Sequence, residues 1–163
     1  MDYQVRQAEQ EDLPRILSLY DSARSFMRAR GNGGQWGSTN PPPEKILGDL
    51  ERNELYVLFD DRGIHGVFMF SLRGEPTYGE IAGAWHSDRP YGVIHRVAGD
   101  GSGGIFRAAA ADGAGFTDHL RVDTHEKNLP MQKAILREGF SLCGVIRLEN
   151  GSERLAYDRV KSL

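Results

Sequence analysis

The feature that most constrains this chain is a glycine-rich turn between an expected strand and an expected helix. Residues 93–98 (VIHRVA) have the branched, alternating character of a strand, and the alanine-rich residues 105–115 favour a helix. Between them lie Gly99, Gly101, Gly103 and Gly104. Because glycine leaves the backbone uncovered at the start of a helix, free N–H groups can converge there on an anion such as a pyrophosphate.

The hydrophobic pattern around this turn predicts a mixture of helices and strands. Strands are expected at residues 3–7, 93–98 and 120–124, and the first and last helices between Asp12 and Gly31 and between Pro130 and Gly139. A short helix is expected at 43–52. Hairpins are expected at 55–59 with 64–72 and at 140–148 with 154–160. Strands 93–98 and 120–124 should be parallel, because a helix joins them.

Length and composition point to one globular domain spanning residues 1–163. With 39% hydrophobic and 26% charged residues, the chain can bury a core without disulfides or metal. A net charge of -3 argues against a nucleic-acid surface, and no apolar run resembles an export signal or a membrane span. Cys143 is the single cysteine, so no internal disulfide can form. We therefore expect a cytoplasmic protein that binds neither nucleic acid nor membrane.

Two interpretations fit the turn when it is considered by itself. Residues 99–104 satisfy G-x-G-x-x-G, and Asp123 ends the next strand about twenty residues later, as in a dinucleotide-binding site. The predicted hairpins argue against this site, because a doubly wound sheet needs further parallel strands on either side. The simpler alternative is that the glycines only form a flexible turn.

The order of the predicted elements resembles the GCN5-related N-acetyltransferase (GNAT) family over essentially the whole chain. Three segments carry the resemblance: residues 94–98 before the turn, 123–128 after the next strand, and 137–140 at the end of the last helix. The spacing from Asn128 to Gly139 and Phe140 is the more specific part. The resemblance implies an α/β (α+β) fold, with a central mixed, mostly antiparallel sheet that contains one splayed parallel pair and is flanked by helices.

The resemblance also implies that acetyl-CoA binds in the cleft where the two parallel strands separate. Val97 and Ala98 would offer main-chain hydrogen bonds to the pantetheine arm, and Asn128 would contact or order the same side of the cleft. Asn128 can equally be a helix cap, and both roles can hold together. The N–H groups at the pyrophosphate would come from Gly101, Ser102, Gly103, Gly104, Ile105 and Phe106.

The turn departs from the family pattern Gln/Arg-x-x-Gly-x-Gly/Ala. Gly101 stands where the family has a basic or amide residue, and Phe106 stands where it has a small one. The turn is also shorter than usual, and Arg107 is a candidate to replace the missing basic residues. Ile135 occupies the position of the tyrosine that often protonates the leaving thiolate, so the resemblance supplies no general acid.

Acetyl transfer to an amine needs a base for the amine and a donor that polarises the thioester carbonyl. His95 is the main candidate for the base, because an imidazole titrates near neutral pH and its strand leads into the turn; it can equally be a hydrogen-bonded structural histidine. The N–H of Val97 is the candidate oxyanion donor. Glu80, His86 and Asp88, in the preceding loop, are alternative acid–base groups.

On the acceptor side, Trp36 and Trp85 are candidate walls of an amine pocket, because an amine or its apolar body can stack on an indole. Either tryptophan can instead belong to the core. His86 and Asp88 are further candidates for binding the acceptor. The mixed charge around them does not distinguish an amino acid from a peptide N-terminus or a polyamine.

No metal site is expected from the sequence. Alternation places His119 and His125 on one side of their strand, but no tight His/Cys/Asp group has the usual ligand spacing, and Cys143 is expected to be a small core residue. We therefore predict an acyltransferase that moves an acetyl group from acetyl-CoA to a primary amine of a small molecule or peptide, by direct attack in a ternary complex. The alternative is a CoA-binding or regulatory domain with weak or no catalysis. Pairing of the final strands between two subunits would give a homodimer.

Overall fold

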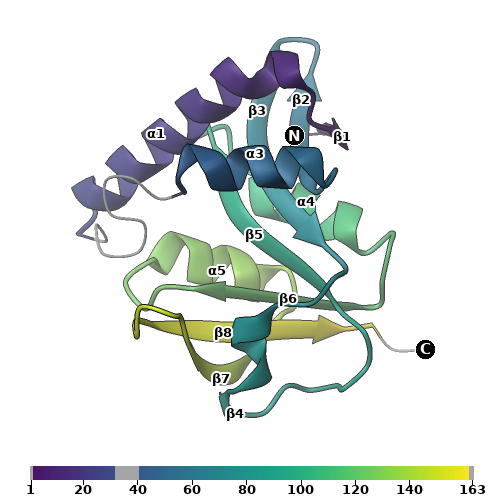
Figure 1. Ribbon diagram of the computed structural model, residues 1–163, viewed down its shortest axis with the longest axis vertical. Helices are drawn as coiled ribbons and strands as arrows, with labels where there is room; N and C mark the ends of the chain where they lie inside the picture. Colours follow the sequence, from purple (N-terminus) through teal and green to yellow (C-terminus); the bar gives the residue numbers. More distant parts are fainter. Residues whose placement is uncertain (1, 32–40, 162–163) are drawn as a thin grey trace.

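One eight-stranded sheet forms the centre of the computed structural model, which describes residues 2–31 and 41–161 (Figure 1). The strands follow the spatial order β1-β2-β3-β5-β6-β8-β7-β4, and only β5 and β6 are parallel neighbours. The expected mixed, mostly antiparallel sheet is confirmed. Its strands are β1 Gln4–Gln7, β2 Leu55–Asp60, β3 Gly63–Ser71, β4 Ala82–Gly83, β5 Gly92–Gly99, β6 His119–Thr124, β7 Ser141–Arg147 and β8 Glu153–Val160.

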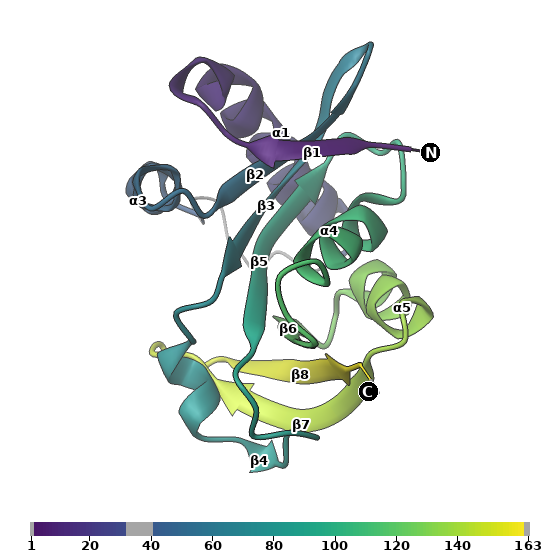
Figure 2. The ribbon, with the colours of Figure 1, turned by 90° about the vertical axis from the view of Figure 1, so that its right-hand side faces the viewer.

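Two pairs of helices cover opposite faces of this sheet (Figure 2). One face carries α1 (Leu13–Ala29) and α3 (Pro43–Glu51), and the other carries α4 (Ile105–Gly113) and α5 (Leu129–Arg137). The described residues also form two short 3-10 helices, η1 (Gln10–Asp12) and η2 (Pro76–Gly79). Helices therefore flank the sheet as expected.

Alternation along the central strands explains why both faces are apolar. In β2, Val57 packs into the core under α1 and α3, while Leu58 packs into the core under α4 and α5, and both are fully buried. Ala109 and Ala110 have small side chains, which let α4 lie close to the sheet. A third cluster joins the segment between β3 and β5, through Tyr78, to strands β5, β7 and β8, through Val93, Ile146 and Ala156.

The parallel strands β5 and β6 pair only at their beginnings. The paired residues are Gly92 with Leu120 and Val93 with Arg121, and no further pair joins the two strands. From Ile94 onward the edge of β5 that faces β6 therefore has no strand partner there. This confirms the splayed pair and opens a cleft between the two strands.

A bulge in β5 changes which side chains share a face. Arg96 has φ 52, and the register with β3 shifts between Val67 and Met69. Simple alternation predicts that Val97 shares a face with His95. This prediction is wrong, because Val97 packs on the α4/α5 side together with Ile94, three positions earlier. The extra residue in the bulge accounts for that spacing.

The residues at the helix ends have only some of the roles that the sequence predicts. Asp12 precedes α1 as expected, but its carboxylate accepts a bond from the Glu9 N–H at 2.8 Å and pairs with Arg6 at 2.7 Å, and it does not cap α1. Gly139 follows α5 with φ 85, the conformation expected after a helix C-terminus. Within the described residues, no helix has the length and apolar character needed to cross a membrane.

Candidate active site

A cleft of about 560 Å³ opens where β5 and β6 separate. Apolar side chains and backbone line the part beside α5, while ionisable groups line the part beside η2 and β6. The lining residues that matter for chemistry are Glu75, His95, Val97, Asp123, Asn128 and Arg154. The cleft is therefore one continuous space with an apolar side and a charged side.

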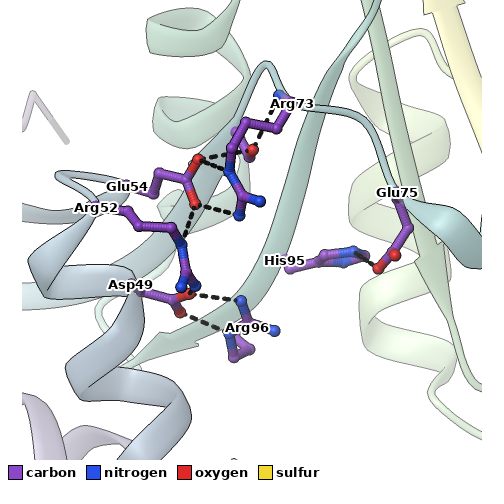
Figure 3. A network of polar contacts seen from close by, with 8 residues as sticks. Asp49, Arg52, Glu54, Arg73, Glu75, His95 and Arg96 are labelled. Atoms are coloured by element: carbon purple, nitrogen blue, oxygen red, sulfur yellow. Dashed lines mark hydrogen bonds and ion pairs between the residues drawn. The ribbon is translucent and has the colours of Figure 1, made fainter.

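His95 points into this cleft from β5 and pairs with Glu75 (Figure 3). Its Nε2 lies 3.0 Å from Oε1 of Glu75, and the two side chains are 16% and 25% exposed. The hydrogen bond from His95 is the main reason that the pKa of Glu75 lies below its usual value. An ionised Glu75 holds the proton of His95 on Nε2, which leaves Nδ1 as the acceptor when the ring is neutral.

Asp123 faces the other nitrogen of His95 from the end of β6. Oδ1 of Asp123 lies 3.6 Å from Nδ1 of His95, and the hydroxyl of Tyr78 donates to the same oxygen at 2.6 Å. Tyr78 is 2% exposed, and burial raises the pKa of its phenol, so it remains a donor. The charged side of the cleft thus presents a carboxylate and an imidazole nitrogen to the same space.

Arg96 fixes the β5 bulge from two directions. Its guanidinium donates to both carboxylate oxygens of Asp49 on α3, at 2.8 and 2.9 Å, and its carbonyl accepts the Tyr20 hydroxyl at 2.8 Å. Asp49 is fully buried and also accepts a bond from Arg52 at 3.0 Å. These contacts offset the strain of the positive φ at Arg96 and hold the neighbouring His95 in place.

A second carboxylate network directs the chain that carries Glu75 (Figure 3). Arg73 donates two bonds to Glu54, at 2.7 and 2.8 Å, and the hydroxyl of Ser71 donates a third at 2.8 Å. The bonds from Arg73 are the main reason that the pKa of Glu54 falls to about 2. Because Glu75 follows Arg73 by two residues, this network holds Glu75 beside His95.

The glycine turn has the backbone conformation that the sequence predicts. Gly101, Gly103 and Gly104 have φ 91, 87 and 73, a region that side chains rarely adopt. Gly104 is the N-cap of α4. By helix geometry, the first N–H groups of α4, those of Ile105 and Phe106 among them, have no partner within the helix and remain able to bind an anion.

Asp100 places a negative charge in this same turn. Its Oδ1 accepts the N–H of Ser102 at 3.0 Å, so one of the amides predicted to bind pyrophosphate is already used. His65 lies between two carboxylates, with Nδ1 2.7 Å from Asp100 and Nε2 2.7 Å from Asp60. Asp100 and then Asp60 raise the pKa of His65, and the protonated ring offsets the charge of Asp100.

The predicted cofactor residues separate into two groups. Val97 and Asn128 line the cleft, and the side chain of Asn128 also caps α5 by accepting the Met131 N–H at 3.2 Å. Ala98 is buried under α1 and does not line the cleft, and the turn lies outside the cleft lining. Ile135, at the position of the family tyrosine, is fully buried in the α4/α5 core.

One candidate acid–base group, Glu80, and three candidate acceptor-binding residues, Trp85, His86 and Asp88, lie outside the cleft lining. Glu80 is exposed and has no contact with His95; the carboxylate that contacts His95 belongs to Glu75. Trp85 is packed rather than open, because its indole donates to the Tyr78 carbonyl at 3.1 Å and stacks on the Arg121 guanidinium. Asp88 is exposed, and His86 is bonded elsewhere. Trp36 lies outside the described residues.

His86 contacts Asp158 and Cys143 instead. Its Nδ1 is 2.6 Å from Oδ1 of Asp158 and 3.3 Å from the sulfur of Cys143. Burial and then Asp158 raise the pKa of Cys143 to about 12, which argues against a nucleophilic thiolate. The expectation that no tight His/Cys/Asp group exists is corrected, because the fold brings His86 to Cys143 and Asp158 on the β7–β8 hairpin, 57 and 72 positions away in the sequence.

Sequence reasoning did not select Glu75 as a catalytic group. Glu75 stands in an irregular segment, and only the fold shows that it, and not Glu80, reaches His95. The sequence marks Asp123 only as the end of a strand, and its bond with Tyr78 spans 45 positions. No local spacing could have revealed these pairs.

Comparison with known proteins places this arrangement among acetyltransferases. No protein-family model and no curated protein sequence matches the chain. A GNAT-family acetyltransferase from Streptococcus agalactiae is 26% identical, with TM-score 0.87 over 99% of this chain and 96% of the other. A GNAT-family acetyltransferase from Listeria monocytogenes is 18% identical, with TM-score 0.71 over 97% and 94%. A ribosomal-protein-alanine N-acetyltransferase from Brucella melitensis is 18% identical, with TM-score 0.65 over 96% and 99%.

The fold, together with the 26% identical acetyltransferase that covers nearly the whole chain, defines the class of protein as acyltransferase. The resemblance to the GNAT family is confirmed, because a GNAT-family acetyltransferase shares this fold along nearly the whole chain. The structural neighbours that are less than 25% identical to this chain show the fold alone.

Proposed function

We propose that the protein transfers an acetyl group from acetyl-CoA to a primary amine of a small molecule or peptide, by direct attack in a ternary complex. The observation that carries the proposal is the pairing of His95 with Glu75 inside the cleft between β5 and β6. A base at His95 would lie beside an acyl group that is bound between the separated strands β5 and β6. The neighbouring acetyltransferase folds support the same reaction class.

Acetyl-CoA fits the structure in two places. The apolar side of the cleft, with Val97 and Asn128, suits a pantetheine arm, and the first amides of α4 suit a pyrophosphate. The Asp100 carboxylate opposes an anion there, and protonated His65 offsets that charge. Arg107, an exposed residue in the first turn of α4, is a further candidate for the phosphates. The proposed site includes all of these features.

The bound thioester would supply an electrophilic carbonyl and a thiolate leaving group. Asp123 would attract the ammonium form of the acceptor, and Nδ1 of His95 would accept a proton from it. Ionised Glu75 would then stabilise the imidazolium through Nε2. The N–H of Val97 is the proposed donor to the carbonyl oxygen. Ile135 is buried and offers no proton to the departing thiolate.

The test measures thiol release and acetyl-CoA binding for the same variants. His95→Ala should lower kcat at least about a hundredfold, because the amine loses its base, while the thermal shift produced by acetyl-CoA stays within about a degree of the wild type. Thiol release is followed across amino acids, peptide N-termini and polyamines. Unchanged turnover in His95→Ala would place the base elsewhere.

The second candidate function is a CoA-binding or regulatory domain with little catalysis. Asp100 in the turn and the buried Ile135 favour it, since both remove features that help acyl transfer. Stabilisation by acetyl-CoA without thiol release for any amine would support this candidate and contradict the first. Stabilisation by NADH but not by acetyl-CoA would contradict both. The cytoplasmic location, the single domain and the homodimer stay predictions.

A further inference from the structure

Three potential metal ligands meet at the edge of the sheet that carries β4. One ligand atom each from His86, Cys143 and Asp158 lies within 4.8 Å of the others, and residues 2–31 and 41–161 contain no second group of this kind. Nitrogen, sulfur and carboxylate oxygen together form the mixed ligand set that suits zinc and similar divalent ions. Calcium and magnesium prefer sites made of oxygen alone.

The backbone is shaped to bring these ligands together. Gly83 on β4 pairs with Gly144 on β7, and a Cβ at Gly144 would lie 2.1 Å from the carbonyl oxygen of Ala82. Only two glycines allow the strands to approach so closely. The register of β7 also shifts between Leu142 and Gly144, which leaves Cys143 in a bulge. The close approach carries the residues after β4, and with them His86, to the sulfur of Cys143.

Asp158 is held in the orientation that a ligand needs. Its side chain is 1% exposed, and its Oδ2 accepts bonds from the His86 N–H at 2.8 Å and from Nε2 of His119 at 3.0 Å. Oδ1 remains directed at the His86 ring. Outer partners that fix a ligating carboxylate in this way are usual around protein metal ions.

The observed distances require only a small adjustment to admit an ion. Tetrahedral zinc with ordinary bond lengths separates nitrogen from oxygen by about 3.4 Å and nitrogen from sulfur by about 3.6 Å. The present separations are 2.6 and 3.3 Å. The side chain of His86 is 50% exposed, so it can move outward while the other two ligands stay in place. Solvent would reach the fourth position from the same side.

We propose that His86, Cys143 and Asp158 bind one divalent ion of the zinc class. The ion fastens residues 72–91, which join β3 to β5, to the closing hairpin of β7 and β8. Those residues contribute Glu75 and Tyr78 to the charged side of the cleft. The guanidinium of Arg121 is held between the Trp85 and Tyr91 rings, 4.0 and 3.9 Å from their centroids. Binding of the ion would release the Cys143 proton to solvent, and the resulting thiolate and the Asp158 carboxylate would balance the charge of the ion. Metal binding at this site does not depend on the proposed acetyl transfer, because none of the three ligands lines the cleft.

Cobalt provides a direct test, because the chain has one cysteine. Untagged protein freed of metal with a chelator is titrated with Co²⁺, and a sulfur-to-cobalt charge-transfer band in the near ultraviolet is followed. We expect the band to saturate at one equivalent, to vanish in Cys143→Ser, and to need at least about tenfold more cobalt in His86→Ala. The matched control His125→Ala, at a histidine on the other side of β8, should keep the band unchanged.

Thermal unfolding gives a second readout that does not depend on activity. Zinc should raise the Tm of the wild type and of His125→Ala, and it should raise the Tm of Cys143→Ser much less. Both Cys143 and His86 are at least partly exposed, so their variants should fold, whereas a change at Asp158 risks the core. A wild type without the cobalt band, or an equal zinc shift in Cys143→Ser, would overturn the proposal.

Discussion

Two glutamates five positions apart show how strongly single-residue chemistry depends on placement. Glu75 contacts Nε2 of His95 at 3.0 Å and is half-buried, whereas Glu80 is exposed and lies outside the cleft lining. The two side chains are chemically identical. Only the one that can stabilise an imidazolium can assist a base at His95.

Glu75→Gln should lower kcat at least about tenfold, because the amide keeps a hydrogen bond to His95 but loses the charge that stabilises the protonated ring. The KM for acetyl-CoA should stay within about twofold of the wild type, since Glu75 lies on the charged side of the cleft, away from the side proposed for the pantetheine arm. Steady-state thiol release at varied acetyl-CoA measures both quantities.

Glu80→Gln is the matched control for that measurement. It makes the same chemical change in the same segment, and we expect its kcat and KM to equal those of the wild type. Equal losses in the two variants would show that the segment responds to charge in general and would argue against a specific role for Glu75.

At the level of elements, the hydrophobic pattern of the sequence is sufficient to predict almost every helix and strand that the structure describes. Both hairpins, the strand–turn–helix around Gly104 and the parallel pair were predictable, because alternation and glycine placement are local signals. The faces of β5 were not predictable, since Arg96 adopts φ 52 although it is not glycine. That conformation depends on Asp49, which is 47 positions away. The two-residue strand β4 gave no signal of its own.

Glycine at the β4–β7 contact should be essential to that part of the sheet. Gly144→Ala combines a positive φ of 153 with a Cβ 2.1 Å from a backbone oxygen that cannot rotate away. We expect it to lower the free energy of unfolding by at least about 3 kcal/mol, from backbone strain together with lost strand pairing. Urea denaturation measures this change.

Gly151→Ala separates the clash from the strain. Gly151 has φ 85, and a Cβ there meets nothing within 4 Å. Its substitution should cost about 1 kcal/mol, the cost of positive φ alone. If the two variants were equally stable, the close approach of β4 to β7 would not restrict the residue at position 144.

At the scale of the whole molecule, the candidate site is assembled from segments that the sequence keeps far apart. His95 could be proposed from its type and its strand, but Glu75 lies 20 positions away and Asp123 lies 28 positions away on another strand. His86 lies still further from its partners, 57 positions from Cys143 and 72 from Asp158. Such groups form only when the strands assemble into the sheet. A sequence pattern therefore predicts the elements that carry these residues, but it does not predict which residues come into contact.

The same long-range assembly predicts how stability depends on pH. His65 joins the β2–β3 hairpin to the glycine turn through Asp60 and Asp100. Because these carboxylates raise the pKa of His65, its stabilising contribution is complete below the unfolded value of 6.5 and is lost as pH rises through the higher folded value. His65 lowers the pKa of Asp60 in return, so that contribution is present above about 3.8 and is lost as pH falls further.

The difference in unfolding free energy between the wild type and His65→Gln isolates this effect, because the other ionisable groups are common to both proteins. We expect the wild type to have its largest advantage between about pH 4.5 and 6.5, with the advantage shrinking as pH rises above 6.5. Urea denaturation at closely spaced pH values measures the difference. Glutamine cannot become charged, so a constant difference from pH 5 to 9 would contradict the prediction. Since Asp100 lies in the turn proposed to hold the pyrophosphate, acetyl-CoA binding to the wild type should weaken over the same range in which His65 loses its proton.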